Sequence, residues 1–151
     1  MLQLQNTKTF IALKQEAATN GATLTSDNID TLGFGEVLIE VHSTTSNNAT
    51  NNCSVLKVQE CDTTVASSFA DITAAVGDGA SGFTIANAAT ATSNTSIAKF
   101  HGRCGGSRKR YLRVLISPLT TQTFSVIAQL GRAEQTPDTI TERGTDVFVT
   151  F

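Results

Sequence analysis

The sequence predicts an all-β protein, a jelly-roll-like antiparallel β-sandwich of about eight or nine short strands. Apolar and polar residues alternate with a period of two in several runs along the chain. Turn-forming residues separate these runs, and no segment carries a long amphipathic helical pattern. Many short strands with frequent turns are typical of sandwiches and jelly rolls.

Five candidate strands lie in the N-terminal half. Residues 9–13 form either a strand or part of a short helix over 10–19, and the β-branched Thr and Ile side chains favour the strand. The next two runs, 36–42 and 54–60, place Val, Ile or Leu at alternate positions, as expected of half-buried strands. Two weaker candidates complete this half: 66–72 and 82–86.

The C-terminal half contains four more candidates. Residues 110–117 and 123–130 alternate regularly, whereas 96–101 and 146–151 are weaker. The stretches between strands, including 19–31, are dense in turn formers and are predicted to be loops. The apolar faces of the two regular runs supply these predicted core residues: Leu112, Val114, Ile116, Phe124 and Val126.

The 151 residues fit a single domain, and a chain of this length buries roughly 70% of its unfolded surface without needing staples. Only 16% of the residues are charged, below the roughly 25% typical of soluble domains, so much of the surface is predicted to be neutral and rich in hydroxyl groups. Such a surface suits burial against partners. Within the domain over residues 1–151, the sequence leaves open an N-terminal arm at 1–18 and an extended loop at 132–145.

The net charge of −2 argues against a surface built to hold nucleic acid. The first 18 residues lack the basic region of a signal peptide, and no stretch approaches the roughly 20 apolar residues of a membrane span. We therefore expect a soluble chain, made in the cytoplasm, with no membrane and no nucleic acid among its partners.

The reactive residue types form no recognisable site. Cys53 and Cys61 lie eight residues apart in one strand, about 26 Å at ~3.3 Å per residue, so they are predicted not to pair. His101 and Cys104 lack the second ligand pair of a zinc site. The string GDGASG at 77–82 matches a dinucleotide-binding spelling, but a strand-like run follows it, so a turn is predicted. We expect no catalytic residue, cofactor, metal or small-molecule substrate, and hence no enzyme.

One charged feature exceeds the background. It is a basic cluster close to the run at 110–117, and its members are Arg103, Arg108, Lys109, Arg110 and Arg113. One interpretation is a contact patch for carboxylates of a neighbouring subunit or for phosphates. The other is a solvated, charged start of a strand that protects a sheet edge. The sequence leaves both open.

Four segments, taken in their order and spacing, resemble small virion structural proteins of tailed bacteriophages, of the type that decorates or cements the capsid. The segments are Ser54–Asp62, Phe69–Ile72, Arg108–Val114 and Leu130–Pro137. The resemblance implies a jelly-roll subunit, assembled as a homotrimer, on the exterior of the capsid in the virion, after synthesis in the host cytoplasm.

The resemblance also implies a function. The expected partner is the major capsid protein, and the expected role is to stabilise the shell by bridging its subunits. The residues that we expect to contact other subunits are Arg108, Lys109, Arg110, Arg132 and Glu134. A tail, neck or receptor-binding module is the alternative, although the absence of Trp and the single Tyr disfavour sugar binding.

Overall fold

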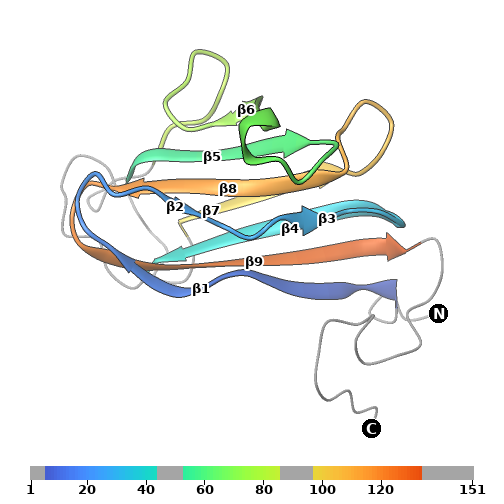
Figure 1. The fold of residues 1–151 in the computed structure, drawn as a ribbon, viewed down its shortest axis with the longest axis horizontal. Coiled ribbons are helices and arrows are strands. Elements are labelled where there is room, and N and C mark those ends of the chain that lie inside the picture. The colour runs from blue at the N-terminus through green and yellow to red at the C-terminus, as the bar shows by residue number, and fades with distance from the viewer. Residues whose placement is uncertain (1–5, 44–52, 86–96, 134–151) are drawn as a thin grey trace, which may run out of the picture.

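The computed structural model describes residues 6–43, 53–85 and 97–133, and these residues form an almost entirely β structure (Figure 1). The strands are β1 (Lys8–Ala18), β2 (Leu24–Thr25), β3 (Ile29–Asp30), β4 (Phe34–Ser43), β5 (Cys53–Cys61), β6 (Ala70–Val76), β7 (Ala98–Arg103), β8 (Tyr111–Pro118) and β9 (Gln122–Ala133). A 3-10 turn, Ala66–Ser68, precedes β6. The predicted fold class is confirmed.

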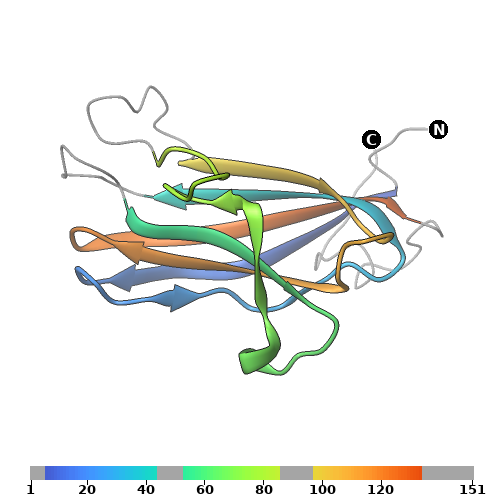
Figure 2. The same ribbon diagram turned by 90° about the horizontal axis from the view of Figure 1, so that it is seen from above.

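The strands form two sheets that pack face to face as two layers (Figures 1 and 2). One sheet has the order β1-β9-β4-β7 and the other has the order β2-β8-β5-β6, with β3 also paired to β8. Because β2 and β3 follow each other along β8, they occupy one strand position. The pairs β1/β9, β2–β3/β8, β4/β7 and β5/β6 are those of one long hairpin rolled onto itself, which is a jelly roll.

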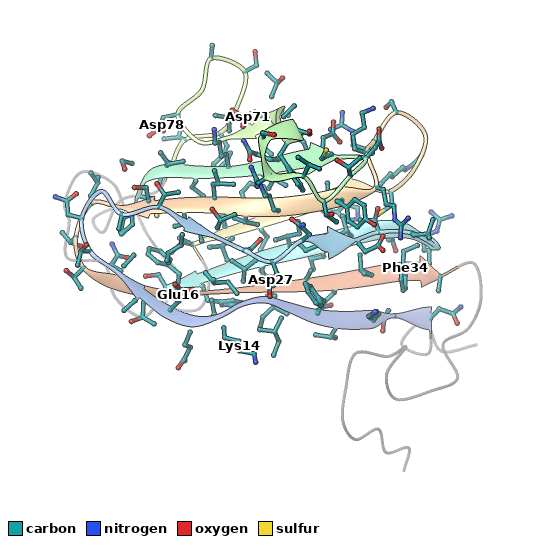
Figure 3. The ribbon with its side chains drawn as sticks, in the orientation of Figure 1. Lys14, Glu16, Asp27, Phe34, Asp71 and Asp78 are labelled. Atoms are coloured by element: carbon teal, nitrogen blue, oxygen red, sulfur yellow. The ribbon has the colours of Figure 1, made fainter. Side chains whose placement is uncertain are left out.

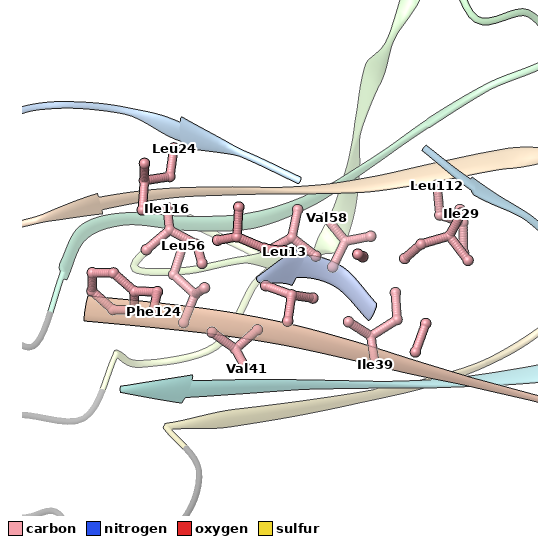
Figure 4. Packing of buried hydrophobic residues seen from close by; sticks show 14 of the residues in the cluster. Leu13, Leu24, Ile29, Ile39, Val41, Leu56, Val58, Leu112, Ile116 and Phe124 are labelled. Atoms are coloured by element: carbon pink, nitrogen blue, oxygen red, sulfur yellow. The ribbon is translucent and has the colours of Figure 1, made fainter. Parts of the chain in front are cut away.

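The core lies between the inner faces of the two sheets (Figure 4). Alternate residues of β4, β5, β8 and β9 point into it, as the period-two pattern predicts. All five predicted core residues are buried, and Phe124 is the largest fully buried side chain among the residues that the structure describes. The four regular runs of the sequence are therefore the four strands at the centres of the two sheets.

The N-terminal residues belong to the sandwich and do not form a separate arm from Lys8 onward. Residues 8–18 are strand β1, paired to β9 at the edge of its sheet. Two register shifts interrupt this pairing, and charged side chains such as Lys14 and Glu16 lie along the edge (Figure 3). Bulges and charges of this kind discourage edge-to-edge association with other sheets.

Two weaker strand predictions and one loop prediction need correction. The chain over 66–72 begins as a 3-10 turn and becomes β6 only at Ala70. Residues 82–86 contribute only an isolated bridge between Gly77 and Phe83, because the chain folds back in a tight turn there. The loop predicted over 19–31 contains β2 and β3. The run at 146–151 lies outside the described residues, as does the predicted extended loop beyond Ala133.

The two sides of the sandwich differ. On the side of β1, the backbone N–H of Asp27 donates to the carbonyl of Ala12 at 2.7 Å, which links the segment between β2 and β3 to the opposite sheet. On the other side, β6 and β7 are the outer strands of their sheets, and they do not pair with each other. A backbone hydrogen bond therefore links the two sheets on the β1 side, whereas no described strand pairing joins them on the side of β6 and β7.

Candidate subunit-contact surfaces

The predicted basic run lies in the connection from β7 to β8, where Arg108 to Arg110 directly precede Tyr111. Each of the three cations faces a carboxylate of the same chain. Lys109 Nζ lies 2.7 Å from Asp62 Oδ2, and Arg108 Nη1 lies 3.6 Å from Glu60 Oε1. The run is therefore neutralised within the subunit and does not form a positive patch.

The contact between Arg110 and Asp30 has the best geometry of the three. Nε and Nη2 of the guanidinium donate to the two carboxylate oxygens at 2.8 and 2.7 Å, a bidentate arrangement that favours Arg over Lys. The guanidinium carbon also lies 4.8 Å from the centre of the Tyr111 ring. This contact fastens β3 to the start of β8.

The carboxylates at the end of β5 also hold the backbone of the loop. Glu60 accepts a hydrogen bond from the Lys109 N–H at 3.1 Å, and Asp62 accepts one from the Arg110 N–H at 3.3 Å. Glu60 and Asp62 thus bind both the backbone of this loop and the side chains of Arg108 and Lys109. Exposed ion pairs contribute only about 0–1 kcal/mol each, so the network orders the loop more than it stabilises the domain.

A second polar network crosses the outer face of β8, β5 and β6 in the same sheet. Arg113 donates through Nε and Nη2 to Gln59 Oε1 at 2.9 and 2.7 Å, and Gln59 Nε2 donates to Asp71 Oδ1 at 2.6 Å. Lys57 completes the row through a 3.0 Å contact with Asp71. The Arg113 guanidinium also stacks 4.1 Å over the Phe69 ring, which holds the segment before β6 against the sheet.

These networks predict a dependence of stability on pH. Hydrogen bonds from Arg110, Lys109 and Gln59 respectively lower the pKa of Asp30, Asp62 and Asp71. A carboxyl with a lower pKa in the folded state stabilises the fold above its unfolded pKa, about 3.9 for aspartate, and loses this contribution as pH falls through the folded pKa. We therefore expect stability to decline progressively from about pH 5 downward.

Denaturant unfolding of the parent and of the triple variant Asp30→Asn, Asp62→Asn and Asp71→Asn, measured from pH 7 to pH 2, tests this expectation. The variant should be less stable at pH 7, and the two curves should converge in acid. Curves that stay parallel over the whole range would show that these carboxyls do not carry the pH dependence.

The remaining two predicted contact residues lie apart from the basic run. Arg132 is exposed near the end of β9, in the opposite sheet, with a left-handed backbone (φ 54°). It lines a surface pocket with Asn6, Thr7 and Glu36. Glu134 lies outside the described residues. The structure therefore brings together three of the five predicted residues and places the fourth elsewhere.

Sequence patterns did not single out a neutral stretch on the outer face of β1 and β9. It presents Ile11, which is 53% exposed, beside Ile127, because the two are register partners. Thr9 and Gln129 form the neighbouring pair. The uncharged residues at the outward positions of the alternating runs could be seen in the sequence. The pairing of β1 with β9, which brings them together, could not.

Paired charges lie at the β4–β7 border of this sheet, and the exposed Lys14 and Glu16 lie along its β1 edge. Lys99 Nζ lies 2.8 Å from Glu40 Oε1, and His101 Nε2 lies 3.7 Å from Glu36 Oε2. The region over β1 and β9 is therefore bordered by balanced charges and is neutral at its centre. A neutral surface loses little solvation when a partner covers it.

The candidate reactive residues are dispersed. Cys53, Cys61 and Cys104 are free thiols, and His101 is exposed on the outer face of β7. The glycines at 77–82 form a turn, as predicted. Over 6–43, 53–85 and 97–133, no group of three or more His, Cys, Asp or Glu side chains is arranged to hold a metal ion.

Comparison with known proteins adds no assignment. The sequence matches no protein-family model, and no curated protein matches it significantly. Among the described residues, no helix is long and apolar enough to cross a membrane. The chain is thus characterised by its jelly-roll sandwich, its internally neutralised basic run and its neutral outer face.

Proposed function

We propose that this chain is a bacteriophage head decoration protein, which binds the outer surface of the capsid as a homotrimer and stabilises the shell by bridging subunits of the major capsid protein. The neutral outer face of β1 and β9 carries the proposal. It joins an exposed apolar side chain, Ile11, to hydroxyl and amide groups on a rigid sheet. The resemblance of four sequence segments to capsid decoration proteins supplies the identity of the partner.

The physical argument rests on repetition. Each face of this kind offers a modest apolar contact, and interfaces bury such surfaces at their centres with polar groups at the rim. A closed trimer presents three copies of the face, so that binding at one site raises the effective concentration at the others. Many weak contacts then hold a shell together without a single strong site.

The basic run has a secondary part in this proposal. Because Arg108, Lys109 and Arg110 already face carboxylates of their own chain, a partner carboxylate would have to compete with these internal partners. Charged groups with balanced partners are suited to the rim of an interface, where they influence orientation and rate more than affinity. We expect the apolar face to contribute more binding energy than the run.

Image reconstruction of the intact particle that contains this chain tests the proposal directly. We expect density for the sandwich on the outside of the head, at sites of threefold or quasi-threefold symmetry, in hundreds of copies. Solution mass measurement of the purified chain should give a trimer. A few copies at the tail or neck would instead establish the alternative, a tail, neck or receptor-binding module.

A matched pair of variants tests the face itself. Ile11→Asp places a charge on the proposed contact face, whereas Val65→Asp places one at an equally exposed apolar position beside the opposite sheet (53% and 55% exposed). In co-sedimentation with capsids stripped of the chain, Ile11→Asp should bind at least about tenfold more weakly, because a buried unpaired charge is costly. Val65→Asp should bind like the parent. Equal binding by both variants would exclude this face.

A further inference from the structure

A cavity of about 520 Å³ lies between the two sheets on the side of β6 and β7, and its lining is largely apolar. Its floor consists of buried core side chains from both sheets, such as Val37 of β4 and Val58 of β5. Nine partly buried hydrophobic residues pack against the described core, and all of them except Phe10 and Phe34 line this cavity. Apolar surface that the described sandwich covers only in part is therefore concentrated at one place.

Strand β7 borders the cavity and is the outermost strand of its sheet (Figure 2). One of its edges pairs with β4, and no other strand of the described chain pairs with it. The opposite edge of such a strand presents unpaired N–H and C=O groups, to which a further strand can add. In an added strand every second side chain would point inward beside Ala98, Phe100 and Gly102, which line the cavity. One extended run with apolar residues at alternate positions would thus cover both the free edge and the cavity.

Residues 146–151 are a run of this kind. Their sequence, DVFVTF, places Val147, Val149 and Phe151 at alternate positions, which is the pattern of a strand with one apolar face. This run is the predicted strand that lies beyond the described residues, so the described sandwich gives its apolar side chains no partner.

The run starts close enough to reach the free edge of β7. β9 and β7 end at the same end of their sheet, because Ala133 pairs with Phe34 and the carbonyl of Gly35 accepts from the Cys104 N–H at 3.0 Å. From β9 across β4 and β7 to the free edge is three strand spacings, about 15 Å. The connecting residues 134–145 can extend over about 40 Å. A segment that arrives from this end of the sheet runs antiparallel to β7.

We propose that residues 146–151 of the same chain add to the free edge of β7 as an antiparallel strand and close the cavity. β7, Ala98–Arg103, has the same length as the run. Aligned end to end, the two strands pair Asp146 with Arg103, Val147 with Gly102 and Val149 with Phe100. The apolar residues of the run then point into the cavity, where burial of apolar surface drives the docking.

Two features of β7 favour this alignment. A Cβ built at Gly102 would meet no heavy atom within 4 Å, so there is room for the Val147 side chain beside it. Arg103 is exposed and makes no ion pair within the described part of the chain, so Asp146 can pair with it across the two strands. This docking site is distinct from the proposed capsid contact, which lies on the outer face of β1 and β9.

A disulfide across the two strands tests the position of the run in the full chain. Thr150 and Lys99 face each other on the outer side in the proposed alignment, so Thr150→Cys with Lys99→Cys should form a disulfide within one chain on mild oxidation. Thr150→Cys with Thr9→Cys is the control, because Thr9 is exposed on β1 at the far edge of the sheet. Peptide mass spectrometry identifies the bond, and non-reducing electrophoresis separates bonds within a chain from bonds between chains.

Two results of this experiment would overturn the proposal. Equal yields from the two cysteine pairs would show that the run has no preferred place on the sheet. Disulfides formed chiefly between two chains would show that the run of a second copy covers the cavity.

A matched pair of substitutions tests whether the apolar face of the run holds it in place. Val149 points inward and Thr150 outward in the proposed alignment, so Val149→Asp should displace the run and Thr150→Asp, beside Lys99, should not. Hydrogen exchange at the amides of β7 should be about tenfold faster in Val149→Asp than in Thr150→Asp, because exchange follows the free energy of local opening and a buried unpaired charge is costly.

Exchange in β5, at the centre of the other sheet, should be the same in both variants and so show that the sandwich stays folded. Equal exchange at β7 in the two variants would overturn the proposal. Neither experiment involves capsids, so a failure here is separate from a failure of the proposed function.

Discussion

Replacement of Phe124 by alanine is expected to lower the free energy of unfolding by about 3–5 kcal/mol. Phe124 is the largest fully buried side chain in the described core, and it lies on the central strand β9 between the two sheets. Truncation removes the transfer free energy of the ring and leaves a cavity that close-packed neighbours fill only in part. Urea unfolding monitored by circular dichroism at pH 7 gives the measurement.

A graded series distinguishes this effect from a general loss of apolar area. Phe124→Leu should cost less than Phe124→Ala, because it retains more of the packed volume. Leu32→Ala removes an apolar side chain that is 65% exposed and should change the free energy by no more than about 0.5 kcal/mol. A Phe124→Ala variant as stable as Leu32→Ala would contradict the position of the core.

The second large effect is expected at Gly82. A Cβ at this position would lie 1.7 Å from the carbonyl oxygen of Val76, which accepts a hydrogen bond from the Phe83 N–H at 3.3 Å. Gly82→Ala must therefore displace the backbone, and overpacking of this kind typically costs about 1–3 kcal/mol. We expect a lower unfolding midpoint and faster hydrogen exchange at the Phe83 amide, because the turn that returns Phe83 to β6 opens.

Gly102→Ala is the matched control, since its added Cβ has no atom within 4 Å. Alanine is also better suited than glycine to the interior of a strand. Gly102→Ala should therefore unfold at the parent midpoint or slightly above it. If Gly82→Ala and Gly102→Ala unfold alike, steric exclusion at residue 82 does not shape the turn.

The basic run illustrates how far sequence reasoning about a surface extends. Spacing placed Arg108, Lys109 and Arg110 together, and the structure keeps them together. Their acceptors Asp30, Glu60 and Asp62 lie between 47 and 80 residues away along the chain, and only strand pairing brings them into contact. The sequence therefore showed a local cluster of cations and left its role open, whereas the fold pairs Arg108, Lys109 and Arg110 with carboxylates of the same chain.

Short strands show a similar limit. β2 and β3 have two residues each, too few for an alternating pattern to be recognised. They form because their residues pair with β8. Between them, Ser26 keeps the chain hydrogen-bonded to β8. The Ser26 N–H donates to the Val114 carbonyl at 2.9 Å, and its Oγ accepts from the Val114 N–H at 2.9 Å, so a side chain completes the exchange with β8.

The sequence by itself determined the fold class, the four central strands and the side of each that is buried. Successive side chains of a strand point to opposite faces, so a strand with one buried face has an apolar residue at every second position. Only the tertiary structure decided which strands are neighbours, and with that the neutral face of β1 and β9, the carboxylate partners of the basic run and the cavity between β6 and β7. These features depend on contacts between residues distant in sequence. Local patterns specify how a segment folds, but the pairing of segments is set by the free energy of the whole sandwich.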